Sequence, residues 1–91
     1  MVSKAELSSW VQQFISQITK EWDLPVTFSI EKPEENQICY QIFLFLNKLH
    51  LSVVVLFDKQ KAEEGDIAEL REKINRGLIL LKELADERIV I

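Results

Sequence analysis

In the sequence QICYQIFLFLNKLHLSVVVLFD, residues 37–58, two apolar runs flank the polar pair Asn47-Lys48, and the fold can be inferred outward from this segment. Runs rich in Ile, Phe, Leu and Val are typical of strands. Asn tolerates the positive φ of a tight turn, although Lys48 stands where such turns favour Gly. We therefore predict a β-hairpin with strands over residues 37–46 and 49–57.

Side chains alternate with a period of two along a strand, which gives this hairpin two unlike faces. A two-residue turn at Asn47-Lys48, or the equivalent four-residue turn, keeps one face uniformly apolar, whereas a three-residue turn would mix the faces. The two-residue register places five pairs on the apolar face: Leu46 with Leu49, Leu44 with Leu51, Ile42 with Val53, Tyr40 with Val55, and Ile38 with Phe57. The other face pairs Phe45 with His50, Phe43 with Ser52, Gln41 with Val54, and Cys39 with Leu56.

A third strand is predicted over residues 26–31, where apolar and polar residues alternate. The connector KPEEN, residues 32–36, contains Pro and Asn, which are typical of turns. We expect this strand to place its apolar side chains on the apolar face of the hairpin, with Ile30 opposite Ile38, Phe28 opposite Tyr40, and Val26 opposite Ile42.

Two amphipathic helices flank the strands. Ser3 and Glu6 form a capping box before apolar residues at helical spacing, which predicts a helix over residues 4–22. Asp66 and Glu69 repeat this pattern before a second helix, over residues 66–86. Residues 58–66 form a charged loop between the hairpin and this helix.

Three features of the second helix and of the residues after it depart from a simple amphipathic pattern. Gly77 costs about 1 kcal/mol relative to Ala inside a helix, so it either marks a close crossing over the sheet or is simply tolerated. Ile79 and Leu80 lie partly off the apolar stripe. The apolar tail RIVI, residues 88–91, has three open interpretations: a short strand, packing under the helix, or fraying.

The pattern predicts a single α+β domain over residues 1–91. Because a sheet with one apolar face must cover it, we expect a two-layer α-β-β-β-α sandwich, a three-stranded antiparallel meander with both helices on one face. The uncovered face and the apolar edge strand 49–57 would then remain exposed, and exposed apolar surface of this kind marks interfaces. The candidate interface residues are Cys39, Phe43, Phe45, His50, Val54 and Leu56.

Charge and composition narrow the functional classes. Eleven basic and fifteen acidic residues give a net charge of −4, which argues against affinity based on nucleic-acid phosphates. One cysteine cannot form an internal disulfide, so a reducing, cytoplasmic compartment is expected. No apolar run approaches the ~20 residues of a membrane span, and the first ten residues lack the apolar core of a signal peptide.

The pattern predicts no catalytic residues, cofactor site or metal site. Cys39 and His50 fall near opposite ends of the predicted hairpin, about 20 Å apart at roughly 3.3 Å per residue, which is too far for a thiol–imidazole pair. A single His and a single Cys at that separation do not form a zinc site. With two glycines, the chain also has no glycine-rich phosphate-binding loop.

These observations favour a small, acidic, non-enzymatic protein–protein interaction module that forms a homodimer, binds another protein, or does both. Two alternatives remain. The element order is similar to that of double-stranded-RNA-binding domains, which implies nucleic-acid binding, but the second helix opens with Glu64, Asp66 and Glu69, the wrong charge for phosphates. The small acidic helix-and-sheet design also resembles bacterial secretion chaperones, which implies an adaptor that dimerises and wraps a client segment.

Overall fold

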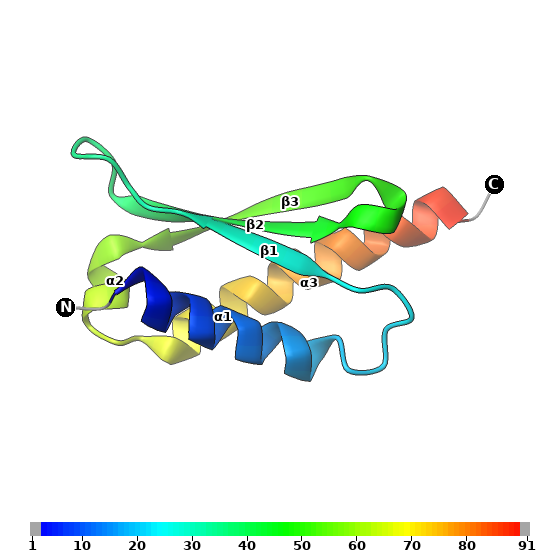
Figure 1. Ribbon diagram of the computed structural model, residues 1–91, viewed down its shortest axis with the longest axis horizontal. Helices are drawn as coiled ribbons and strands as arrows, with labels where there is room; N and C mark the ends of the chain where they lie inside the picture. The colour runs from blue at the N-terminus through cyan, green and yellow to red at the C-terminus, as the bar shows by residue number, and fades with distance from the viewer. Residues whose placement is uncertain (1–2, 90–91) are drawn as a thin grey trace.

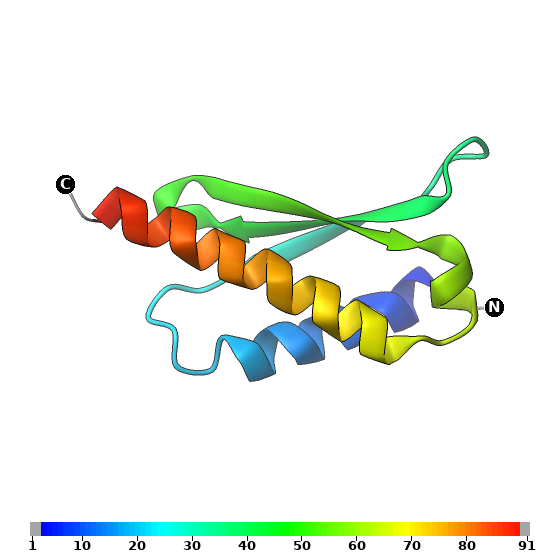
Figure 2. The same cartoon turned by 180° about the vertical axis from the view of Figure 1, so that it is seen from behind.

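Two long helices lie on one side of a three-stranded antiparallel sheet in the computed structural model, which describes residues 3–89 (Figures 1 and 2). The predicted α+β class and the antiparallel meander are confirmed, with β2 in the centre of the sheet. The elements, in chain order, are α1 (Lys4–Ile18), β1 (Thr27–Glu31), β2 (Cys39–Leu46), the 3₁₀ turn η1 (Asn47–Leu49), β3 (Leu51–Asp58), α2 (Lys59–Glu63) and α3 (Ile67–Ile89).

The β2–β3 turn is the four-residue form, so the two-residue register is wrong by two positions. Leu46 pairs with Leu51, and residues 47–50 form the loop. His50 adopts a left-handed conformation, with φ of 54°, and its N–H donates to the Asn47 carbonyl at 3.2 Å. A two-residue turn needs positive φ at both central residues, and Lys48 disfavours that. Because the shift is even, the two faces keep their predicted residues except near the turn.

The β1 register is wrong by four positions, again an even number. Ile30 pairs with Ile42, and Phe28 pairs with Leu44. A turn in which the Gln37 N–H donates to the Glu34 carbonyl at 2.9 Å lengthens the connector. As a result Ile38 lies before β2 and is 71 % exposed, in contrast to its predicted position on the buried face opposite Phe57.

Helix α1 begins as predicted but ends four residues early. The Ser3 hydroxyl accepts the Glu6 N–H at 3.1 Å, which confirms the N-cap. At the other end the Thr19 hydroxyl donates to the Ile15 carbonyl at 2.6 Å, and the chain then turns toward β1. Trp22 therefore lies outside the helix, although it still packs against the core, with the Lys82 ammonium 5.8 Å from its ring centroid.

The predicted charged loop over residues 58–66 contains a short helix, α2. Asp58 caps it by accepting the Gln60 N–H at 2.7 Å, and Ala62, a residue of this helix, is buried. An apolar residue among so many charges gave too weak a periodic signal to predict this helix.

Helix α3 begins after Asp66, whose carboxylate accepts the Glu69 N–H at 3.1 Å. The reciprocal half of the capping box is absent, because the Asp66 N–H donates to the Lys61 carbonyl at 3.0 Å. The Glu69 Oε2 atom is buried without a hydrogen-bond partner. The helix continues past the predicted residue 86 to Ile89, so a strand at residues 88–89 is wrong, while residues 90–91 of the predicted tail lie outside the described part.

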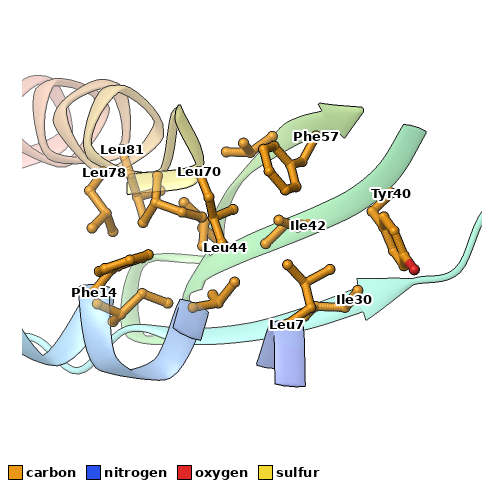
Figure 3. Close-up of a cluster of buried hydrophobic side chains, with 14 of the residues drawn as sticks. Leu7, Phe14, Ile30, Tyr40, Ile42, Leu44, Phe57, Leu70, Leu78 and Leu81 are labelled. Carbon is orange, nitrogen blue, oxygen red and sulfur yellow. The ribbon is translucent and has the colours of Figure 1, made fainter. Parts of the chain in front are cut away.

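The core fills the space between the sheet and the helices (Figure 3). Even-numbered residues of β2 and odd-numbered residues of β3 enter it from the sheet. Side chains at helical spacing on α1 and α3 meet them. The largest fully buried side chains are Phe57, Leu7, Ile42, Leu44, Leu46, Leu70, Ile74, Leu78, Leu81 and Val11.

Removing the Asp66 cap provides a test of how α3 begins. We expect Asp66→Ala to lower the free energy of unfolding by about 1 kcal/mol, because the Glu69 N–H loses its acceptor. Asp66→Asn keeps an acceptor oxygen at this position and should lose much less. Urea denaturation followed by circular dichroism measures both values, and equal losses for the two variants would contradict the capping role.

Candidate interaction surface

The sheet face that points away from α1 and α3 carries a group of apolar side chains. Phe43 lies between Ser29 and Val54 across the three strands, and Phe45 lies between Thr27 and Ser52. The two phenyl rings stack, with centroids 6.3 Å apart and planes at 15°. Val54 is 52 % exposed and Leu56 is 49 % exposed. We call Phe43, Phe45, Val54 and Leu56 the open-face patch.

The open-face patch is not centred on the sheet. The β1 residues of this face are polar and exposed: Thr27, Ser29 and Glu31. The β3 residues Val54 and Leu56 are apolar and stand at the opposite margin. The apolar surface therefore extends to the outer edge of β3 and stops before the edge formed by β1.

That outer edge of β3 presents backbone groups that do not pair with β2. The N–H of Lys59 donates to the Ile38 carbonyl at 2.7 Å, toward β2, whereas the Leu56 carbonyl accepts the Lys73 ammonium at 3.0 Å on the other side. In an antiparallel strand the backbone N–H and C=O groups of successive residues point alternately toward and away from the neighbouring strand. The N–H and C=O groups of Ser52, Val54 and Leu56 therefore point away from β2. We call these groups the β3 edge, and no other strand within residues 3–89 borders it.

Below the β3 edge, a groove separates β3 from α3. Its lining residues are Val54, Val55, Leu56, Lys73, Arg76, Gly77 and Leu80. Leu80 is 49 % exposed on this flank of the helix, so apolar side chains lie both above and below the β3 edge. Arg76 is exposed and forms an ion pair with Glu72 at 2.5 Å.

Four of the six predicted interface residues, the members of the open-face patch, lie together. Cys39 shares their face but sits at the far end of β2, half-buried opposite Asp58. His50 does not lie opposite Phe45, as the two-residue register predicted, because the longer turn moves it into the loop and Ser52 takes its place. Cys39 and His50 are thus at opposite ends of the β2–β3 hairpin.

Sequence reasoning missed the contribution of α3 to this surface. Leu80 lies off the main apolar stripe of the helix, and that displacement was the available signal. The helical spacing could not show which flank of α3 lies beside β3, because the crossing position depends on Gly77 packing against Val55 and Leu44.

Within residues 3–89, no three His, Cys, Asp or Glu side chains cluster in a way that could hold a metal ion. Over the same residues, none of the helices combines the length and the apolar character needed to span a bilayer.

No family model, curated protein or solved structure matches this chain. The open-face patch, the β3 edge and the flank of α3 beside it are therefore the observations from which a function is inferred.

Proposed function

We propose that this protein is a small, non-enzymatic protein–protein interaction module of the cytoplasm that self-associates through the β3 side of its sheet. The observation that carries the proposal is the β3 edge, unpaired within residues 3–89, which has the half-exposed side chains of Val54 and Leu56 above it and that of Leu80 below it. A contiguous apolar group that reaches an unpaired strand edge is typical of an interface.

The energetics support an interface that extends beyond these three side chains. Fully burying a Val or Leu side chain stabilises a complex by roughly 1.5–3 kcal/mol, and about half of that is available where the side chain is already half buried. A stable interface commonly buries about 800 Å² on each partner, more than a few side chains supply. The β3 edge and the groove beside α3 are contiguous with Val54 and Leu56 and supply the remaining contact surface.

Solution mass by light scattering over a concentration series tests self-association. We expect the chain to form a dimer, and Val54→Asp to weaken the dimer at least tenfold, because Val54 belongs to both the open-face patch and the β3 edge. Tenfold corresponds to about 1.4 kcal/mol. Circular dichroism should show that the variant keeps its helices.

Ser29→Asp is the matched control. It places the same charge on the same sheet face, one strand beyond Phe43, on the polar β1 margin, and should leave the mass unchanged. A chain that stays monomeric at every concentration would overturn self-association. Equal weakening by both substitutions would show that the β3 side has no special role.

A further inference from the structure

We propose that the partner is a second copy of this chain, bound edge to edge: the two β3 strands pair antiparallel about a two-fold axis near Val53, and the two α3 helices pack side by side beneath the junction. This geometry rests on the proposed self-association and names its surface. It differs from face-to-face stacking of two open-face patches, which the same self-association would also allow.

The backbone of β3 is already arranged for such pairing. Ser52 and Val54 direct their N–H and C=O groups away from β2. Ser52 of one copy can therefore exchange hydrogen bonds with Val54 of the second copy, and Val54 of the first with Ser52 of the second. The Leu56 carbonyl lies just beyond this short ladder, so its contact with the Lys73 ammonium at 3.0 Å can persist in the pair. The Lys73 ammonium, which reaches up from α3, occupies the β3 edge at Leu56 and so confines the ladder to the residues around Val53.

The layer beneath the β3 edge favours a second copy over an isolated peptide strand. Residues three, four and seven apart share one flank of a helix, and on the β3 side of α3 this flank carries Lys73, Arg76, Leu80, Glu83, Leu84 and Glu87. We call these residues the outer flank. A peptide strand would satisfy the β3 edge but leave Leu80 exposed, whereas a second copy covers Leu80 with its own α3.

The charges on the outer flank are complementary under a two-fold axis. Lys73 and Arg76 lie on the N-terminal side of Leu80, and the exposed Glu83 and Glu87 lie on its C-terminal side. An antiparallel pair of α3 helices places the basic end of each copy beside the acidic end of the other. This local attraction opposes the general repulsion between two chains that each carry a net charge of −4.

The strand and helix geometries locate the same axis. Starting from the Lys73–Leu56 contact, the helix reaches Leu80 after about 10 Å, at a rise of roughly 1.5 Å per residue. The strand reaches Val53 after about 10 Å, at roughly 3.3 Å per residue. Figure 2 shows α3 crossing beneath β3 in the opposite direction to the strand. Leu80 and Val53 therefore lie at a similar level, and one axis can relate both layers.

A charge exchange tests this geometry directly. One variant, Lys73→Glu with Arg76→Glu, makes the outer flank acidic, and the other, Glu83→Lys with Glu87→Lys, makes it basic. We expect each variant alone to be monomeric by light scattering and an equimolar mixture of the two to recover the dimer mass. Arg71→Glu and Asp86→Lys are the controls, because Arg71 lines a groove between α1 and α3 and Asp86 lines a groove between residues 21–24 and α3; each should leave the dimer unchanged.

Val54→Pro tests the strand layer independently of charge. The N–H of Val54 points away from β2. Proline at this position therefore removes a hydrogen bond to the second copy without removing one from the β2–β3 ladder. We expect a folded monomer. Phe45→Asp should remain dimeric, because edge-to-edge pairing leaves the ring of this central-strand residue outside the interface.

The possible failures are distinguishable. A wild-type monomer would overturn both this geometry and the proposed self-association. In a second outcome, the wild-type chain, the charge-reversal variants and Val54→Pro are all dimeric, and Phe45→Asp is monomeric. That outcome would overturn the edge-to-edge geometry and leave self-association standing as face-to-face stacking. Charge variants that fail to recover the dimer on mixing would also overturn the proposed pairing.

Discussion

Leu44→Ala is expected to lower the free energy of unfolding by about 2–5 kcal/mol. Leu44 lies in the middle of β2, is fully buried, and points toward α3 near Gly77. The truncation removes apolar contacts and leaves a cavity that the surrounding strands and helix fill only in part. Because domains of this kind are stable by roughly 5–15 kcal/mol, the loss is a large fraction of the total.

Phe45→Ala is the control for this prediction, because it removes an even larger side chain from the next residue of the same strand. Phe45 is half-buried on the open face, so its loss should be clearly smaller than that of Leu44→Ala. Urea denaturation of all proteins at one fixed concentration measures both, since self-association makes the apparent stability depend on concentration. A larger loss for Phe45→Ala would contradict the assignment of the two sheet faces.

Gly77→Ala is expected to destabilise the protein by up to about 2 kcal/mol, although Ala is the better helix former. A Cβ atom at residue 77 would lie 2.6 Å from Val55 Cγ2 and 3.0 Å from Leu44 Cδ1. Val55 is β-branched and buried, so its side chain cannot easily rotate away. Overpacking costs roughly 1–3 kcal/mol, which exceeds the gain of about 1 kcal/mol in helix propensity.

A double-mutant cycle isolates this contact. In a Val55→Ala background the closest contact is removed and only the end of the flexible Leu44 side chain, 3.0 Å away, has to shift, so Gly77→Ala should become stabilising, by up to about 1 kcal/mol. Asn75→Ala, on an exposed part of α3, should be mildly stabilising in both backgrounds. Urea denaturation gives the four free energies, and a Gly77→Ala effect of the same sign in both backgrounds would show that the Val55 contact does not require glycine.

Close packing at Gly77 also bears on the proposed dimer. It brings α3 against β3, which places Leu80 and the charged residues of the outer flank beside the β3 edge. A side chain at residue 77 would push the helix away from the sheet and misalign the two layers. Gly77→Ala should therefore weaken self-association as well as folding, if the edge-to-edge geometry is correct.

Much of the open-face patch could be predicted from alternation alone. Phe43, Phe45, Val54 and Leu56 share a face in any register that differs by an even number of residues, so errors of two and four positions did not disperse them. His50 was misplaced because it lies in the turn itself, where the register error has its full effect. Because of the same register errors, Ile38 was predicted to lie on the buried face, whereas in the structure it is exposed.

Local sequence pattern alone was enough to predict the order of the two long helices and three strands, the helix caps at Ser3 and Asp66, and the face on which each residue within β2 and β3 lies. These features depend on local hydrogen bonding and on the periods of strand and helix, which neighbouring residues encode. Only the tertiary structure decided the strand registers, the end of α1 and the line along which α3 crosses the sheet. Those depend on packing between residues distant in the chain, such as Gly77 with Val55 and Lys73 with Leu56, and no local pattern specifies such pairs.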